Sequence, residues 1–169
     1  MKLIQAKKEH VIQILEILTD ASAFLREQGI DQWQGVGAPT EEEVRRSVAD
    51  GTQYALTDAG KIVAVCTVVS DEPAYLQIDG RWLSLGNYLA VHRVAVERST
   101  RGRGLTKVLY QEIEGLARSR GIKFLRVDTH RENKIMQRAF LSCGFTACGV
   151  VQYRADGSME RLAYEKEIK

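Results

Sequence analysis

The sequence predicts an α/β protein with one mixed sheet and helices on its faces. A strand, a helix and a second strand follow one another over residues 87–127, and a crossover of that length joins parallel neighbours. Two pairs of strands separated by short turns indicate antiparallel hairpins. The length of 169 residues fits one domain, so we expect a single domain over residues 1–169.

Composition narrows the class of protein. Hydrophobic residues make up 44% and charged residues 27%, and 24 basic against 22 acidic residues give a net charge of +2. This balance excludes a disordered polyanion and gives no argument for nucleic-acid binding. No apolar run reaches the about 18 residues of a membrane helix, and residues 1–13 do not resemble a signal peptide. Three scattered cysteines indicate a reducing compartment, so we expect a cytoplasmic protein without membrane attachment.

Apolar periodicity and turn signals place the elements of the N-terminal half. The expected order is a strand over 3–6, helical stretches over 11–18 and 21–28, a polar, glycine-rich passage over 30–39, a helix over 40–50, and a hairpin within 53–69 that turns at 58–61. Thr40 is the expected N-cap of the third helix, and Glu43 completes a capping box. Gly51 is expected to end that helix.

The C-terminal half carries the crossover and the second hairpin. Residues 71–86 give the weakest pattern, for which we expect a short strand around 75–78 and a turn at 79–80. The expected elements that follow are a strand over 87–96, a helix over 105–120, a strand over 124–127, a helix over 133–143, a strand over 145–153, a turn over 155–158 and a strand over 161–167. The helix over 105–120 has a continuous apolar stripe, which indicates that one face is buried.

The segment over residues 93–113 carries the strongest chemical signal. A strand ends in a loop with two glycines and two arginines, and a helix follows at once. Glycine lets a ligand approach the backbone, and the first N–H groups of a helix attract an anion. This construction suits a phosphate or pyrophosphate. The spacing excludes a Walker A loop and a dinucleotide-binding turn, while a solvated basic connection would fit the same residues.

Two motifs in this sequence resemble the GNAT superfamily of N-acetyltransferases. RGRGLT (101–106), preceded by HRVAV (92–96), resembles the acyl-CoA signature, and NKIMQRAFLSCGF (133–145) resembles the second CoA element. The order of elements also agrees with that family over nearly the whole chain. The resemblance implies a GNAT-like fold whose central parallel strands splay apart, and acetyl-CoA as co-substrate without a metal.

The resemblance also implies which residues contact the co-substrate. The pantetheine arm is expected to pair with Val94, Ala95 and Val96, with Asn133 and Phe140 beside it. The pyrophosphate is expected on the loop formed by Arg101, Gly102, Arg103, Gly104, Leu105 and Thr106. Two positions depart from the family pattern: Thr106 replaces the usual Gly or Ala, and Phe140 replaces a tyrosine that often protonates the departing thiolate.

The implied reaction is direct attack of an amine on the thioester in a ternary complex. The amine must be neutral, so a base should remove its proton. The candidates are His92 and Glu72, with Asp128 as a third, and the N–H of Val94 is the candidate for stabilising the oxyanion. Each has a plainer alternative: His92 in the sheet or facing solvent, Glu72 at the surface, and Asp128 as a turn or N-cap carboxylate.

Three functions from different classes remain open at this point. The first is an acetyl-CoA-dependent N-acetyltransferase that acts on an amine of a small molecule or a protein. The second, motivated by Phe140, is a CoA-binding sensor that has lost catalysis. The third is a nucleic-acid-binding protein, which the charge balance disfavours. The sequence does not name the acceptor, and an exposed sheet edge is compatible with a homodimer.

Overall fold

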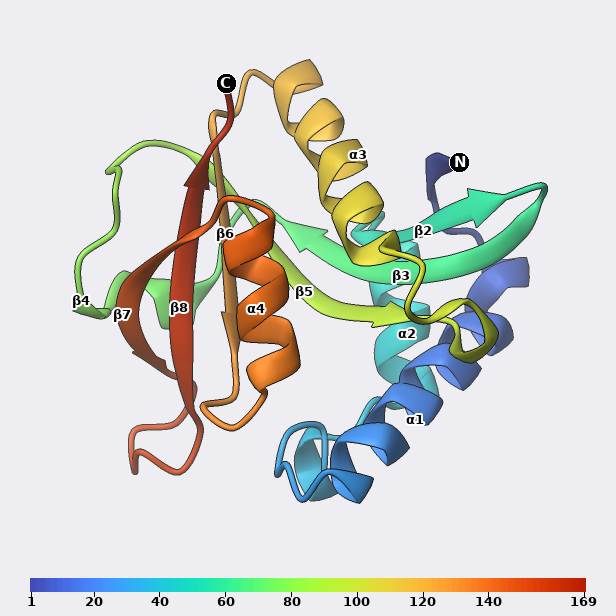
Figure 1. Ribbon diagram of the computed structural model, residues 1–169, viewed down its shortest axis with the longest axis horizontal. Coiled ribbons are helices and arrows are strands. Elements are labelled where there is room, and N and C mark those ends of the chain that lie inside the picture. The colour runs from blue at the N-terminus through green and yellow to red at the C-terminus, as the bar shows by residue number, and fades with distance from the viewer. The chain divides into compact units, whose positions relative to one another are not determined.

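The computed structural model describes all 169 residues as four α-helices and eight β-strands (Figure 1). The helices are α1 (Val11–Glu27), α2 (Glu41–Ala49), α3 (Leu105–Ser119) and α4 (Lys134–Ser142). The strands are β1 (Lys2–Gln5), β2 (Gln53–Asp58), β3 (Lys61–Val69), β4 (Asp79–Gly80), β5 (Tyr88–Val96), β6 (Phe124–Thr129), β7 (Thr146–Gln152) and β8 (Glu160–Glu167). The predicted mixed α/β class is confirmed, because antiparallel pairs dominate and one pair is parallel.

The chain divides into two compact units that share strand β5. The first unit contains Met1–Val68 and Arg93–Glu112, and the second contains Val69–His92 and Ile113–Lys169. The first unit carries β1, β2, β3 and the C-terminal part of β5. The second carries the N-terminal part of β5 with β6, β8, β7 and β4 in that order. None of the helices is long and apolar enough to span a membrane.

In the first unit, β2 pairs antiparallel with both β1 and β3. The hairpin between β2 and β3 turns through Ala59 and Gly60, whose φ angles of 47° and 79° are those of a type I′ turn. Beyond the end of β5, the Glu97 N–H donates to Val63 O at 2.9 Å. The first half of α3 also belongs to this unit, and its Glu112 accepts a hydrogen bond from the Leu3 N–H at 3.2 Å.

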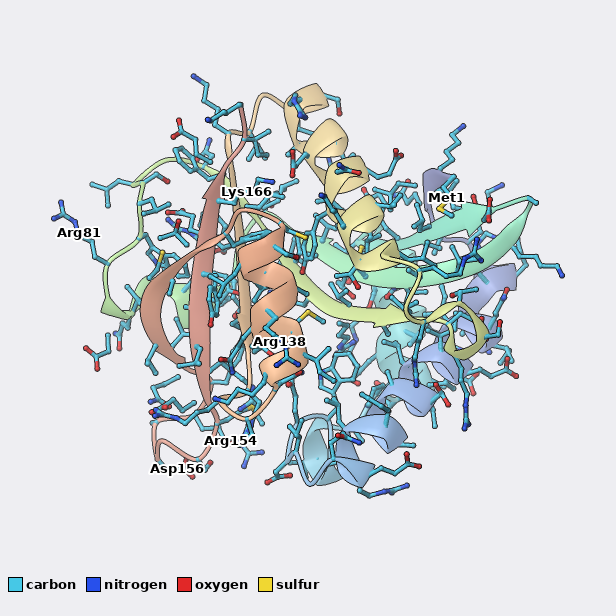
Figure 2. All side chains as sticks on the ribbon, viewed as in Figure 1. Met1, Arg81, Arg138, Arg154, Asp156 and Lys166 are labelled. Carbon is cyan, nitrogen blue, oxygen red and sulfur yellow. The ribbon has the colours of Figure 1, made fainter.

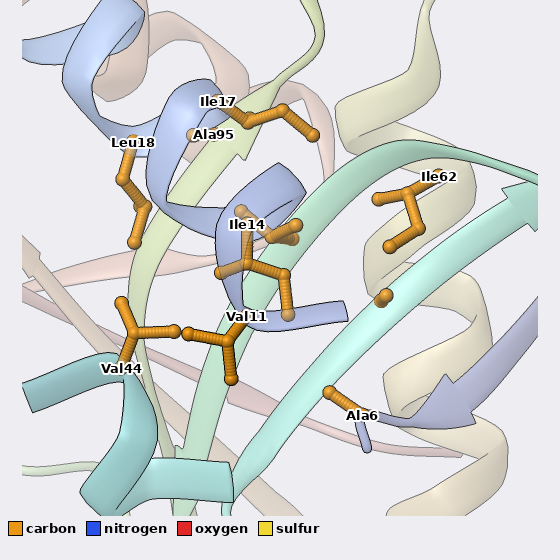
Figure 3. Close-up of a cluster of buried hydrophobic side chains, with 10 residues drawn as sticks. Ala6, Val11, Ile14, Ile17, Leu18, Val44, Ile62 and Ala95 are labelled. Carbon is orange, nitrogen blue, oxygen red and sulfur yellow. The ribbon is translucent and has the colours of Figure 1, made fainter. Parts of the chain in front are cut away.

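The core of the first unit lies under helix α1. Figure 3 shows Val11, Ile14, Ile17 and Leu18 on one side of this helix, packed with Val44 of α2 and with strand residues. Sequence analysis predicted two helical stretches here, and that prediction was wrong because α1 continues without interruption from Val11 to Glu27. No glycine or proline lies within that span, and one apolar face runs along it, so nothing breaks the helix.

Helix α2 begins as its sequence predicts. The Thr40 side chain accepts a hydrogen bond from the Glu43 N–H at 3.2 Å, and Glu43 Oε2 accepts one from the Thr40 N–H at 3.1 Å. This reciprocal pair is the predicted capping box, which satisfies two backbone N–H groups at the start of the helix. Both oxygens of Glu43 have partners, since Oε1 lies 3.0 Å from Arg93 Nη2.

The second unit is built on the parallel pair of β5 and β6. Tyr88 pairs with Phe124, Leu89 with Leu125 and Ala90 with Arg126, after which β6 runs on to Thr129 without a registered partner on β5. The registered parallel pairing of β5 with β6 therefore ends at Ala90. Strand β8 lies between β6 and β7 and pairs antiparallel with both.

The segment over residues 71–86 differs from its prediction. Residues Pro73–Leu76 form a 3-10 turn in place of the expected strand, because Glu72 caps the turn by accepting the Ala74 N–H at 3.1 Å. Asp79–Gly80, expected as a turn, is strand β4 and pairs with β7. A Cβ on Gly80 would lie 2.2 Å from Cys148 O, so only glycine allows this close approach of the two backbones.

The remaining elements agree with the prediction to within a few residues. Asn133 is the N-cap of α4, accepting the Met136 N–H at 3.1 Å, and Cys143 is its C-cap. The predicted turn between β7 and β8 is present, with the Gly157 N–H donating to Arg154 O at 3.1 Å. Figure 2 labels Arg154 and Asp156 on this connection. Strand β6 is longer than expected, so Asp128 lies inside it.

Candidate active site

The loop between β5 and α3 exposes a run of backbone N–H groups. Gly102 and Gly104 have φ angles of 80° and 72°, a region that residues with a Cβ rarely adopt. No atom lies within 4 Å of the Cβ that either glycine lacks, so the backbone is open to a ligand. Gly104 O accepts the N–H groups of Lys107 and Val108, but the N–H groups from Gly102 to Thr106 donate to no group of the protein. Such free donors at a helix N-terminus favour an anion.

The arginines of this loop are paired within the protein. The Arg101 guanidinium lies over the Phe24 ring at 5.1 Å, donates to Val96 O at 3.4 Å and pairs with Asp20 of α1. Arg103 Nη2 lies 4.0 Å from Asp58 Oδ2. Arg101 therefore ties the loop to α1 and β5, and the backbone N–H groups are the part of the loop best placed to receive a phosphate.

Three side chains predicted as candidate bases lie together in the second unit. His92 Nε2 is 3.2 Å from Glu72 Oε2, and His92 Nδ1 is 3.6 Å from Asp128 Oδ2. The side chains of His92, Glu72 and Asp128 are 20%, 18% and 9% exposed. The 3.2 Å approach of His92 Nε2 to Glu72 Oε2 is within ion-pair range but lacks hydrogen-bond geometry, so it is an electrostatic contact.

Two tyrosines hold the third member of this group. The hydroxyls of Tyr75 and Tyr153 each donate to Asp128 Oδ2 at 2.7 Å. Burial and the nearby charge of Asp128 raise the pKa of both phenols well above its ordinary value. Both therefore remain neutral donors at physiological pH, and they fix the Asp128 carboxylate beside His92.

The environment of Glu72 keeps this carboxyl ionised. Burial raises its pKa, but the electrostatic contact with His92 and the hydrogen bond from the Ala74 N–H outweigh burial and hold the pKa below its ordinary value. An ionised carboxylate beside an imidazole can accept a proton that passes through the ring. The group is thus suited to general-base chemistry.

The structure places the other predicted residues as follows. Val94 and Val96 are half-buried, while the Ala95 side chain belongs to the core under α1. Asn133 caps α4. Phe140 is 2% exposed and packs against Phe145 and Tyr164, with ring centroids 5.7 and 5.2 Å away.

Some members of the site lie in surroundings that the sequence did not indicate. Asp128 was weighed as a base but was expected to serve a turn or the next helix; it accepts hydrogen bonds from two tyrosines, and Asn133 caps that helix. Tyr75 was not singled out, because its position was expected to be a short strand. Glu72 was expected at the surface, whereas it is largely buried and faces His92. No group of three or more His, Cys, Asp or Glu side chains is arranged to hold a metal ion.

Comparison with known proteins defines the class of this chain. The family model described as "Acetyltransferase (GNAT) family" matches residues 14–145. The chain therefore belongs to the GNAT family of acetyltransferases, whose general reaction is acetyl transfer to amine acceptors.

Solved structures of GNAT-family acetyltransferases are also similar to this chain. A GNAT-family acetyltransferase from Streptococcus agalactiae 2603 is 30% identical, with a TM-score of 0.87 over 99% of this chain and 95% of that one. A GNAT-family acetyltransferase from Listeria monocytogenes 4b F2365 is 20% identical, with a TM-score of 0.74 over 98% and 93% of the two chains. The ribosomal-protein-alanine N-acetyltransferase from Brucella melitensis is 16% identical, with a TM-score of 0.71 over 99% of each chain. The latter two similarities concern the fold alone. No curated protein matches the chain.

Proposed function

We propose that this protein transfers the acetyl group of acetyl-CoA to a primary amine of a small molecule or a protein. The observation that carries the proposal is the run of free N–H groups from Gly102 to Thr106 at the start of α3. Family membership supplies the reaction class. The loop suits a doubly charged pyrophosphate, because several N–H donors and the helix dipole act on the same anion.

The remaining contacts to acetyl-CoA follow from the family resemblance. In this proposal the backbone of Val94, Ala95 and Val96 pairs with the pantetheine arm, and Asn133 and Phe140 line the arm. The N–H of Val94 donates to the thioester oxygen as negative charge develops on it, which lowers the barrier to attack.

The amine reacts by direct attack in a ternary complex. Its nitrogen forms a bond to the thioester carbon, the carbon–sulfur bond breaks, and the amine's proton passes to the group formed by Glu72 and His92. Asp128, held by Tyr75 and Tyr153, orients the imidazole through Nδ1. An alkyl thiol has a pKa of about 8.5, so CoA can leave as a thiolate without an acid at the position of Phe140.

Thiol release tests the proposal directly. Purified protein is incubated with acetyl-CoA and a panel of amines that includes polyamines, aminoglycosides, amino acids and peptides with a free N-terminal alanine. The peptides are included because the Brucella melitensis neighbour is named for a ribosomal-protein alanine. We expect amine-dependent release of free CoA and an acetylated product by mass spectrometry.

The alternative function is a CoA-binding sensor, which the buried, non-donating Phe140 favours. Calorimetric titration with CoA separates the two functions. Tight CoA binding without turnover of any amine would replace the enzyme by the sensor. Absence of both CoA binding and turnover would remove the proposed function altogether.

A further inference from the structure

Residue Arg93 has a backbone conformation that is unusual for a strand. It lies inside β5, yet its φ angle is +51°, in the left-handed region that costs free energy for any residue with a Cβ. In a regular strand, successive side chains alternate between the two faces. A left-handed residue interrupts this alternation and reorients the peptide groups on either side of it. Those neighbours are His92 and Val94, which the proposed mechanism uses as part of the base and as the oxyanion donor.

A strained residue persists only where its surroundings hold it. The Arg93 side chain extends to helix α2, where Nη2 lies 3.0 Å from Glu43 Oε1. Glu43 is itself fixed, because its other oxygen accepts the Thr40 N–H and the Thr40 hydroxyl, each at 3.1 Å. The carboxylate that holds Arg93 is therefore anchored by the capping box of α2.

We propose that the ion pair between Glu43 and Arg93 is a positioning element, which holds the left-handed conformation of Arg93 and so orients the adjoining peptide groups of His92 and Val94 for acetyl transfer. Neither Glu43 nor Arg93 contacts substrate in this proposal. The inference rests on the proposed function, since it concerns the same reaction. It adds a helix-to-strand contact that determines the geometry of the reacting groups.

The variant Glu43→Gln tests the ion pair with little effect on the helix. Glutamine also completes a capping box, so α2 keeps its N-terminus. Its NH2 group cannot accept a hydrogen bond from the Arg93 guanidinium. The matched control is Glu41→Gln, which removes the exposed pair of Glu41 with Arg45 on the same helix. We expect Glu43→Gln to lower kcat on the order of tenfold with little change in the KM for acetyl-CoA, because small misplacement of reacting groups slows catalysis. We expect Glu41→Gln to match the wild type.

A second pair of variants separates backbone positioning from general destabilisation. Arg93→Gly loses the guanidinium but adopts positive φ without penalty, whereas Arg93→Ala loses the guanidinium and keeps the penalty. We expect Arg93→Gly to retain several-fold more activity than Arg93→Ala. Glycine is also the more stable replacement at a φ angle of +51°, so activity is compared per folded protein, with the folded fraction taken from urea unfolding. Equal kcat per folded protein in the two variants indicates a purely structural role.

The outcomes distinguish this inference from the proposed function. Equal kcat in Glu43→Gln and Glu41→Gln, or equal activity of the two Arg93 variants, overturns the positioning role. If the wild type acetylates no amine, the proposed function fails, and backbone NMR shifts of His92, Arg93 and Val94 decide the inference. Shifts in Glu43→Gln toward an extended Arg93 support the ion pair as the element that holds the left-handed conformation, and unchanged shifts refute it.

Discussion

Replacing Glu165 by Gln removes one charge of an ion pair that has almost no contact with water. Arg126 Nε donates to Glu165 Oε1 at 2.7 Å, and the two side chains are 6% and 0% exposed. Arg126 also donates to Ser84 O at 2.9 Å, while Glu165 accepts the Ser84 N–H at 3.0 Å. The guanidinium lies between the rings of Trp82 and Tyr88, 4.1 and 3.9 Å from their centroids.

The size of the effect follows from this burial. Removing one partner leaves a buried charge without its counter-charge, which costs about 3–5 kcal/mol of unfolding free energy. Many domains have only about 5–15 kcal/mol in total, so Glu165→Gln and Arg126→Met should both be strongly destabilised. The double variant Arg126→Met with Glu165→Gln removes both charges. We expect it to lose less than the sum of the single losses, because neither charge is left buried without its partner.

Urea unfolding at pH 7 measures these differences. The control is Arg131→Gln, which removes an exposed pair with Glu160 and should change stability by no more than about 1 kcal/mol. A loss below about 1 kcal/mol for Glu165→Gln, or strictly additive losses in the double variant, would contradict the reasoning. If either single variant fails to fold while the double variant folds, the inference of an uncompensated buried charge is supported.

Three further predictions concern the candidate site. Gly104→Glu should abolish CoA binding in calorimetry, because the carboxylate repels the pyrophosphate and the φ of +72° disfavours any side chain. The control Gly115→Ala, inside α3 with open space around it, should bind CoA normally. Intact CoA binding by Gly104→Glu would disprove the loop assignment. Because folding lowers the pKa of Glu72, its contribution to stability is present above the pKa of the unfolded state, about 4.3, and is lost as pH falls through the pKa of the folded state. The melting temperature of Glu72→Gln should therefore fall less on the acid side than that of the wild type. Identical dependence of the two melting temperatures on pH would contradict this linkage. Tyr153→Phe should lose about 1.5–3 kcal/mol of unfolding free energy, since its hydroxyl donates to the Asp128 carboxylate, and a change within error in urea unfolding would refute that.

Local signals in the sequence predicted much of the fold. The capping box of Thr40 and Glu43, the hairpin between β2 and β3, and the crossover through α3 are present where the pattern indicated them. The segment over 71–86 was not predicted correctly, because its conformation depends on contacts with other strands. Gly80 is a strand residue only because it lies against Cys148 of β7.

The candidate site also has one part that local sequence signals predicted and one part that depends on contacts between distant residues. The loop over 101–106 is contiguous in the chain, so its glycines and the following helix were sufficient to predict an anion site. The contacts among Glu72, His92 and Asp128 depend on how β5 and β6 are paired and on the turn that follows Glu72. Each residue was identified on its own, but nothing in the sequence indicated that they lie together or that Tyr75 and Tyr153 hold Asp128.

By itself, the sequence predicted most of the helices, the hairpin between β2 and β3, and the glycine-containing loop over 101–106, because these depend on backbone preferences and apolar spacing within a few residues. The tertiary structure alone decided which side chains meet: Glu43 with Arg93, Arg126 with Glu165, and the carboxylates with His92. Such pairs depend on strand register and helix packing, which are set by burial summed over the whole core and therefore leave no local pattern in the chain.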